Sequence, residues 1–437
     1  MRRERTLHHR IACATVVTLM LTALVQGQEV PVEIPSVEVK PYSVNGFLEF
    51  RPVAILVDPD AALTKLRTVE GNIPDRTATQ LNSRVQLDAV YRRGWFSAQT
   101  RAVVEGGYES SDWSGDATAY EAYVSVKPGP SLTVDIGKRT FKWGKGYLWN
   151  PAAFIDRAKN PEDPALALEG FVALSVDYIR TFTGPLQVVS ATPVLLPVFG
   201  DLNHDFGQRD HVNLAGKLYL LLYDTDIDVM FLTGGSRPDR FGFDVSRNVS
   251  SNVEVHAEWT HIPDSVLPVL SPNGTLVPRT HPATDFVLGI RYLTEQNTTY
   301  IVDYFRNGSG YTPRELDAYF ELIERGYEST TSNDGQLLAL AREAADAGYG
   351  RITPQRNYVY GRVNQPDALG VLYLTLGGSA IVNTDDRSYS LLPEVQYRPT
   401  ENLELRWLAN IQRGGSRTEF GEKPADLRLE IRVRYYF

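Results

Sequence analysis

The sequence predicts an all-β fold, a transmembrane antiparallel β-barrel of about 18 strands, with about 16 as the alternative. Three observations carry this prediction. The last eleven residues alternate strictly between apolar and polar side chains, short and long connections succeed each other between strand-like segments, and the only long apolar run lies near the N-terminus. Because a membrane barrel carries its hydrophobic signal in alternation, the chain is expected to cross a bilayer with strands.

Residues 1–27 have the three parts of a secretory signal peptide. The apolar run 11–25 follows a basic start formed by Arg2, Arg3, Arg5 and Arg10. Small residues near Gly27 favour cleavage before Gln28, and the run is too short for the alternative of a retained membrane anchor. The only cysteine, Cys13, lies in this run, so cleavage would remove all thiol chemistry.

The remaining chain divides into a lead-in and a barrel. Residues 28–42 are extended and rich in Pro and Val, which we interpret as a periplasmic lead-in, and residues 43–437 are assigned to the barrel. Short turns are predicted at 128–130, 184–185, 224–225, 295–297 and 399–401. They alternate with long links near 107–116, 140–169, 195–210, 261–282, 307–355 and 414–425. Short periplasmic turns and long extracellular loops alternate in this way in membrane barrels. The least regular strands are 44–51, 241–246 and 253–259.

The last strand, Leu427 to Phe437, carries the most regular alternation. A tilted membrane strand needs about 9 to 11 residues with one face on lipid and the other on a wet lumen. An edge strand of a soluble sheet is the alternative. With Tyr435 and Phe437 at its end, the strand resembles the closing strand of Gram-negative outer-membrane β-barrels. This resemblance implies that the barrel-assembly machinery reads these two aromatic residues as an assembly signature.

At the level of pattern, the resemblance to porin-like barrels extends over the whole of residues 43–437. It implies a location in the bacterial outer membrane, contact with its lipid, and passive diffusion of small polar solutes through a porin or substrate-selective channel. Porin-like barrels are often homotrimers, and this assembly is expected here. The alternative function is a barrel plugged by its own loops that serves envelope assembly or the export of a polymer or hydrophobic compound.

Two loops are expected to narrow the lumen, because a barrel of this size is too wide for wall side chains to fill. Loop 140–170 mixes aromatic and charged residues and is predicted to fold inward as a constriction loop through Lys142, Trp143, Lys145, Tyr147, Asp156, Arg157 and Lys159. An extracellular flap is the alternative. Loop 307–355 has helical periodicity, and Thr312 and Glu315 form a capping-box pattern, which predicts a helical extracellular loop.

Inward-facing charges are predicted to form two opposite walls. The last three strands present the basic residues Arg398, Arg406, Arg428, Arg432 and Arg434. Half a circumference away lie the acidic residues Asp226, Asp228, Glu254, Glu258, Asp285 and Asp303. Across a wet pore these walls would create a transverse field that orients dipolar solutes. In the alternative, the two signs pair between neighbouring strands and only stabilise the wall.

The composition disfavours other classes of function. The net charge is −9, and loss of a leader with four Arg and one Glu would make it about −12, which disfavours nucleic-acid binding. The sequence contains no G-x-S-x-G, H-E-x-x-H or P-loop motif. His204, Asp205, Asp210 and His211 fall in a polar loop, where they are expected to be solvated. We therefore predict no enzymatic activity, no metal site and no cofactor.

Overall fold

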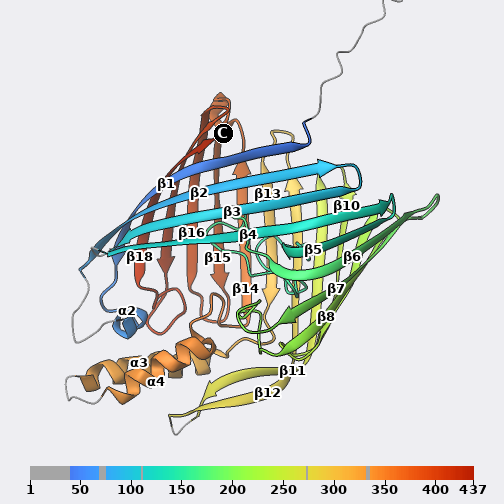
Figure 1. Cartoon of the computed structure of the whole chain (residues 1–437). Coiled ribbons are helices and arrows are strands. Elements are labelled where there is room, and N and C mark those ends of the chain that lie inside the picture. The colour runs from blue at the N-terminus through green and yellow to red at the C-terminus, as the bar shows by residue number, and fades with distance from the viewer. Residues whose placement is uncertain (1–39, 68–74, 110–111, 272–273, 331–334) are drawn as a thin grey trace, which may run out of the picture. The chain divides into compact units, whose positions relative to one another are not determined.

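The barrel closes through its first and last strands. The computed structural model describes residues 40–67, 75–109, 112–271, 274–330 and 335–437. Within these residues, 18 antiparallel strands form one sheet in the unit Pro41–Phe437, and β1 (Tyr42–Val57) pairs with β18 (Ala425–Tyr436) (Figure 1). The predicted signal peptide and the lead-in as far as residue 39 lie outside the described residues.

Every other strand pairs with its two sequence neighbours, which makes the sheet an up-and-down meander. The predicted number of 18 strands is confirmed, and the three least regular predicted strands form β1, β10 and β11. The strands between the first and the last are β2 (Thr77–Arg93), β3 (Phe96–Glu109), β4 (Asp112–Gly129), β5 (Leu132–Arg139), β6 (Phe171–Thr181), β7 (Leu186–Val198), β8 (His211–Leu222), β9 (Thr225–Thr233), β10 (Arg240–Ser250), β11 (Val253–Leu270), β12 (Leu276–Leu293), β13 (Thr299–Arg306), β14 (Asn357–Gln365), β15 (Leu374–Asn383), β16 (Tyr389–Thr400) and β17 (Leu403–Arg413).

Two predicted long links are strands instead. β3 and β4 continue to Glu109 and Asp112, and β11 and β12 pair as far as Leu270 and Leu276. The prolines of the second link interrupt the alternation, but a register shift between Ile262 and Ser265 lets the pairing resume beyond Pro263. The resulting hairpin has 18 residues in each strand, more than the roughly 9 to 11 that a membrane crossing needs.

The outer face of the barrel is apolar. On β18, Leu429, Ile431 and Tyr435 are 48, 45 and 51% exposed, whereas the alternating Glu430 and Arg432 are 4 and 3% exposed and face inward. Exposed aromatic side chains lie at the short-turn end, including Trp95, Tyr223, Tyr373 and Phe437, and Trp113 lies at the long-loop end. An apolar band flanked by aromatic residues is the surface that a bilayer requires of a barrel.

Three α-helices in the described residues lie at the long-loop end of the barrel: α2 (Ala62–Arg67), α3 (Pro313–Thr330) and α4 (Gln336–Ala344) (Figure 1). Their apolar faces form one buried cluster around Leu66, Tyr319, Phe320 and Leu338, which also includes Leu267 of β11. The short η1 (Ala345–Tyr349) follows α4, and η2 (Ala368–Gly370) lies in the β14–β15 turn. None of the described helices combines the length and apolarity needed to cross a membrane.

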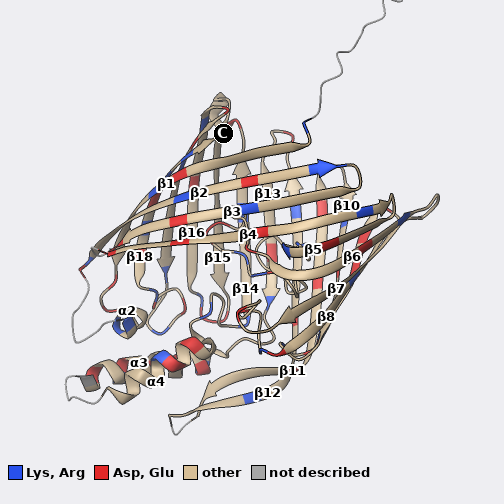
Figure 2. Ribbon diagram, viewed as in Figure 1, with Lys and Arg blue, Asp and Glu red and all other residues tan. Residues whose placement is uncertain are grey.

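These helices connect opposite sides of the barrel rim. α2 follows β1, and the helical cluster rests on β11, which lies almost half a circumference away in the 18-stranded sheet. Arg417, in the loop between β17 and β18, adds an ion pair to Glu324 of α3 at 2.7 Å. The helices therefore form a lid over the long-loop mouth. Figure 2 shows that α3 carries much of the acidic charge of this lid.

Candidate functional site in the barrel lumen

Loop 140–170, which connects β5 to β6, lies inside the barrel and is called the constriction loop below. Its residues contact inward side chains of strands far apart around the sheet, including Glu258 of β11, Asp303 of β13 and Arg432 of β18. A single loop reaches these strands only by crossing the lumen. The structure thus places the predicted constriction residues within the barrel and not in an extracellular flap.

Glu258 fixes the first part of the constriction loop. Its carboxylate accepts the backbone N–H groups of Lys145, Gly146 and Ala152 at 2.5, 2.6 and 3.1 Å and the side-chain amide of Asn150 at 3.0 Å. The Glu258 side chain is almost completely buried. A buried carboxylate that satisfies several amides in this way gives the loop one defined path along the wall.

The two glycines of the motif K-W-G-K-G-Y permit this close approach. Gly144 has a φ of 90°, a conformation that disfavours side chains. A Cβ atom on Gly146 would lie 2.0 Å from the carbonyl oxygen of Trp149. Only glycine at both positions lets the loop backbone turn against Glu258.

Most charged residues of the constriction loop form hydrogen bonds within the loop or ion pairs with the barrel wall. Asp156 accepts the N–H groups of Phe141 and Trp143 at 2.8 and 2.9 Å, and burial outweighs these bonds and raises its pKa. Lys159 donates to the carbonyl oxygens of Gly146 and Tyr147. Arg157 forms ion pairs with Glu169 and Asp205 near the base of the loop. The backbone of Lys142 has a left-handed conformation, with a φ of 56°.

Lys145 fastens the loop to the predicted acidic wall. Its ammonium lies 3.0 Å from Asp228 and 3.9 Å from Asp244, and Lys217 of β8 lies 3.6 Å from Asp228. Both aspartates are buried, with exposed fractions of 2 and 0%. The loop therefore brings a cation of its own to these carboxylates.

The apolar residues of the constriction loop fill two sectors of the lumen. Trp143, Phe154 and Ile155 pack with inward residues of β6 to β9 in one buried cluster. Leu148 and Trp149 pack with β12 to β15 in another, where the Trp149 ring stacks on Phe305 at 5.0 Å between ring centroids. Close-packed side chains exclude water, so both clusters are dry. A second pocket of about 310 Å³ lies beside the first cluster and is lined by Lys145, Lys217 and Ser190 among others.

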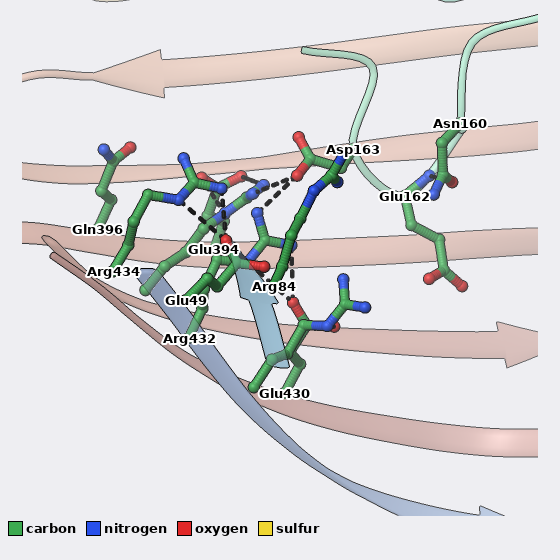
Figure 3. Close-up of polar contacts among 12 residues, drawn as sticks. Glu49, Arg84, Asn160, Glu162, Asp163, Glu394, Gln396, Glu430, Arg432 and Arg434 are labelled. Carbon is green, nitrogen blue, oxygen red and sulfur yellow. Dashed lines mark hydrogen bonds and ion pairs between the residues drawn. The ribbon is translucent and has the colours of Figure 1, made fainter. Parts of the chain in front are cut away.

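The tip of the constriction loop reaches the predicted basic wall (Figure 3). The Asp163 carboxylate lies 2.9 Å from Arg406 and 2.7 Å from Arg432. Glu162 pairs with Arg428 and accepts a hydrogen bond from Asn410 at 2.8 Å. Burial alone would raise the pKa of Asp163, but the guanidinium groups of Arg406 and Arg432 outweigh it and lower the pKa.

The wall arginines also pair with carboxylates of neighbouring strands. Arg434 lies 2.6 Å from Glu49 of β1, and Arg398 lies 2.7 Å from Glu404 of β17. Arg406 lies 2.8 Å from Glu394 of β16, and Arg432 lies 3.7 Å from Glu49 of β1 and 2.8 Å from Glu430 of its own strand. Pairing between neighbouring strands, which the sequence left as an alternative to a field across the lumen, is thus present on this side.

A pocket of about 300 Å³ lies between the loop tip and the basic wall. The loop contributes Asp163 and the backbone segment from Ala165 to Ala167. The strands contribute the arginines Arg362, Arg398, Arg406, Arg432 and Arg434 and the carboxylates Glu394 and Glu404. Five arginines and three carboxylates line the pocket, which gives the lining a positive excess that Glu49 and Glu430, the partners of Arg434 and Arg432, partly offset.

The predicted acidic residues were expected to line a water-filled surface, but most of them are covered by loops. Asp228, Glu258 and Asp303 are at most 2% exposed because the constriction loop covers them. Asp285 accepts the N–H of Gly308 at 2.6 Å and so holds the loop that bears the lid. The two remaining members are half-buried: Glu254 lies beside Arg291, and Asp226 accepts the hydroxyl of Tyr219. The wall mainly anchors loops, which removes most of its charge from any open passage.

Sequence reasoning did not predict which carboxylates pair with the basic residues. Glu162 and Asp163 lie in the loop stretch N-P-E-D-P, and Glu49 lies on the first strand. Two adjacent acids between prolines, at the middle of a loop expected to cross the lumen, are the signal that could have identified the loop pair. No comparable signal distinguishes Glu49 from the other alternating charges of the strands.

Comparisons with known proteins support the fold. No protein-family model matches the sequence, and no curated protein sequence matches it significantly. Pseudomonas aeruginosa OccK11 (OpdR) has a TM-score of 0.52 and 11% identity, over 90% of this chain and 96% of that chain. Acinetobacter baumannii OccAB1 has a TM-score of 0.50 and 11% identity over 90 and 96%. Pseudomonas aeruginosa OccK5 (OpdH) has a TM-score of 0.50 and 12% identity over 90 and 98%. The chain therefore has the fold of outer-membrane porins.

Proposed function

We propose that this chain is an outer-membrane channel for passive diffusion of small polar solutes, with its passage along the arginine side of the lumen. The observation that supports this path is the unequal filling of the barrel. Apolar clusters fill much of the lumen against β6 to β9 and against β12 to β15, where a second pocket of about 310 Å³ remains beside β6 to β8. Polar and charged groups surround the pocket on the opposite side, where β16, β17, β18, β1 and β2 meet the loop tip.

The lining of this passage favours anions. The excess of arginines around the pocket creates a positive potential, and a narrow channel with charged walls selects ions by the sign of that charge. The predicted basic residues Arg398, Arg406, Arg432 and Arg434 belong to this lining, and Arg428 lies beside it on β18. The lumen therefore has one charged side, which borders the pocket, and an opposite side on which the constriction loop covers most of the acidic residues.

A second candidate function is a plugged barrel that serves envelope assembly or export. The helical lid over the mouth and the ion pairs of the loop tip favour this reading, because both obstruct the lumen. The two candidates differ in a single property, the flow of ions through the resting protein. Neither of them assigns a catalytic step to the chain.

Conductance in a planar lipid bilayer tests the proposed function. The refolded protein should produce discrete current steps with anion selectivity in a salt gradient, and vesicles that contain it should admit small neutral sugars. A protein that inserts as a heat-modifiable barrel but produces no current and no sugar uptake would contradict the channel and support the plugged barrel.

The proposal extends to assembly in the membrane. Tyr435 and Phe437 are about half exposed on the outer face of the closing strand, where the barrel-assembly machinery could read them. Phe437 also exchanges two backbone hydrogen bonds of 3.1 Å with Gly46 across the seam. A homotrimer remains part of the proposal, and the mass of the unheated, detergent-extracted protein tests it.

A further inference from the structure

The tip of the constriction loop is a compact turn that presents two carboxylates to the wall. Its N–H groups bond within the turn, Asp163 to the carbonyl oxygen of Asn160 at 3.1 Å and Glu162 to the Asn160 side chain at 3.0 Å. Pro161 and Pro164 flank the acidic pair and limit its backbone freedom. The turn therefore delivers both acids as one rigid unit to Arg406, Arg428 and Arg432.

We propose that Glu162 and Asp163 are a built-in counter-anion, which multivalent inorganic anions such as sulfate or phosphate displace when they bind to Arg406, Arg428 and Arg432. This inference rests on the proposed channel function, because the displaced tip borders the proposed passage. Glu162 and Asp163 would then determine anion specificity, because any anion that binds these arginines must compete with the two carboxylates.

The structure favours release of the tip over release of the whole loop. The buried apolar clusters include loop residues from Trp143 to Ile155, but none between 156 and 170 among the residues described. Hydrogen bonds to Glu258 hold the same early part. The tip is held mainly by ion pairs with the wall arginines, and an anion that binds these arginines competes with those pairs directly.

Each of the three arginines keeps a partner when the tip leaves. Each of the three still has a wall carboxylate near it, Glu394 beside Arg406 and Glu430 beside Arg428 and Arg432, so displacement leaves no guanidinium isolated. Arg84 lies beside this network in Figure 3. It is 5% exposed, and within the described chain its terminal Nη2 has no hydrogen-bond partner. Arg84 lies 3.3 Å from Glu105 and does not line the pocket, but its Nη2 is a buried donor close to the network.

Burial and pairing also keep the competing acid charged. The lowered pKa of Asp163 means that this carboxylate stays ionised at neutral and mildly acidic pH. Protonation therefore does not release the tip in that range, and competition by another anion is the route to release. Planar guanidinium groups suit this exchange because they bind carboxylate, sulfate and phosphate oxygens with the same paired geometry.

Thiol labelling of the tip tests the proposal without relying on current. Ala165 lines the pocket beside Asp163, and the variant Ala165→Cys in a Cys13→Ser background has a single thiol. A charged, membrane-impermeant thiol reagent is applied to the full barrel in vesicles, in sodium sulfate, sodium phosphate or sodium chloride of equal ionic strength. Sulfate and phosphate should each raise the labelling rate about fivefold over chloride, the change expected for loss of the partly exposed Glu162–Arg428 ion pair.

Matched variants separate displacement from a general salt effect. The double change Glu162→Gln and Asp163→Asn should label rapidly in all three salts, whereas Glu169→Gln removes one charge at the loop base and should keep the anion dependence. Equal rates in chloride, sulfate and phosphate for the Ala165→Cys parent would overturn the proposal. Conductance of the same samples reports the channel separately: labelling that depends on sulfate in a silent barrel supports the counter-anion and contradicts the proposed function.

Discussion

At the scale of single residues, Glu258 decides where the constriction loop lies. Changing Glu258 to Ala would leave the N–H groups of Lys145, Gly146 and Ala152 buried without an acceptor. Each such group costs about 1–3 kcal/mol, which is enough to detach this part of the loop from the wall. We expect trypsin to cut the folded Glu258→Ala barrel within the loop, after Lys142 or Lys145, while the wild type resists.

Glu254 provides the matched control for this change. It lies four residues away on the same strand and faces the same lumen, but it lies beside Arg291 and His256, and within the described part of the chain no loop N–H group donates to it. Glu254→Ala should therefore keep the loop resistant to trypsin. Equal resistance of both variants, read from peptide masses, would show that Glu258 does not hold the loop.

A second residue, Glu419, makes the stability of the loop between β17 and β18 depend on pH. Its carboxylate is fully buried and accepts hydrogen bonds from Tyr358 and Asn383, both at 2.7 Å. Burial raises the pKa of Glu419 from 4.5 to about 7; Lys423 and the Tyr358 bond oppose this rise, and Asp386 adds to it. A raised carboxyl pKa stabilises the fold fully below pH 4.5, and this contribution is lost as pH rises through about 7.

Hydrogen exchange of loop 414–424 measures this dependence. Between pH 5 and pH 8.5 the wild-type loop should lose up to roughly 3 kcal/mol of protection after correction for intrinsic exchange rates. Glu419→Gln keeps the neutral form at every pH and should lose much less. A wild-type loop whose protection is unchanged over this range would contradict the prediction.

The alternation of apolar and polar residues along the strands predicted which side chains face the lumen, but not which residues they pair with. Arg406, Arg428 and Arg432 face inward as their positions in the strands require. Their partner Asp163 lies 243 residues before Arg406, in a loop without periodicity. Period-two patterns specify the face of a sheet, whereas contacts with a crossing loop depend on the path of that loop.

At the scale of elements, the constriction loop narrows the barrel inside the lumen, and the helical lid narrows its mouth at the long-loop end. The capping box that predicted the start of α3 is confirmed: Glu315 accepts the N–H of Thr312 at 2.8 Å, and the Thr312 hydroxyl accepts the N–H of Glu315 at 3.3 Å. Local patterns of this kind depend on residues three apart and are therefore readable from sequence. The packing of α2 onto α3 depends on segments about 250 residues apart, and no local pattern reports it.

Removal of the lid tests its place over the mouth. Replacing residues 312–350 by a short Gly-Ser linker should leave the 18-stranded barrel folded, because its strands pair without the helices. Single-channel conductance should increase, since the mouth would lose the helices that connect opposite sides of its rim. The weaker change Arg417→Gln removes the ion pair to Glu324 and should increase current noise more than conductance. Unchanged conductance after the deletion would place the lid away from the path of ions.

At the scale of the whole molecule, the barrel is asymmetric around its axis. The predicted picture of two charged walls across open water is wrong for the buried acids Asp228, Glu258 and Asp303. Strand order correctly set the acidic and basic strands on opposite sides, but the sequence pattern contains no information on which wall the loop would cover. The hydrophobic residues of the loop settle that choice, because Trp143 and Phe154 bury their rings against β6 to β9 and Trp149 buries its ring against β12 to β15.

The closing seam makes a prediction for biogenesis. Tyr435 and Phe437 lie on the lipid face, so replacing both with Ser should not disturb the lumenal ion pairs of β18. If the assembly machinery reads these aromatic residues, the double variant should show several-fold less heat-modifiable barrel in cell envelopes but normal refolding in detergent. Normal amounts in the envelope would contradict the role of the signature.

The position of the passage is the central claim, and site-directed block of current tests it most directly. Gln396 lines the pocket beside the arginines, and Ser190 lines a second pocket of about 310 Å³ against β6 to β8. In a Cys13→Ser background, a bulky thiol reagent on Gln396→Cys should remove more than half of the single-channel current, whereas the same reagent on Ser190→Cys should leave it nearly unchanged. Block through Ser190→Cys with full current through Gln396→Cys would place the passage on the other side of the barrel and contradict this account.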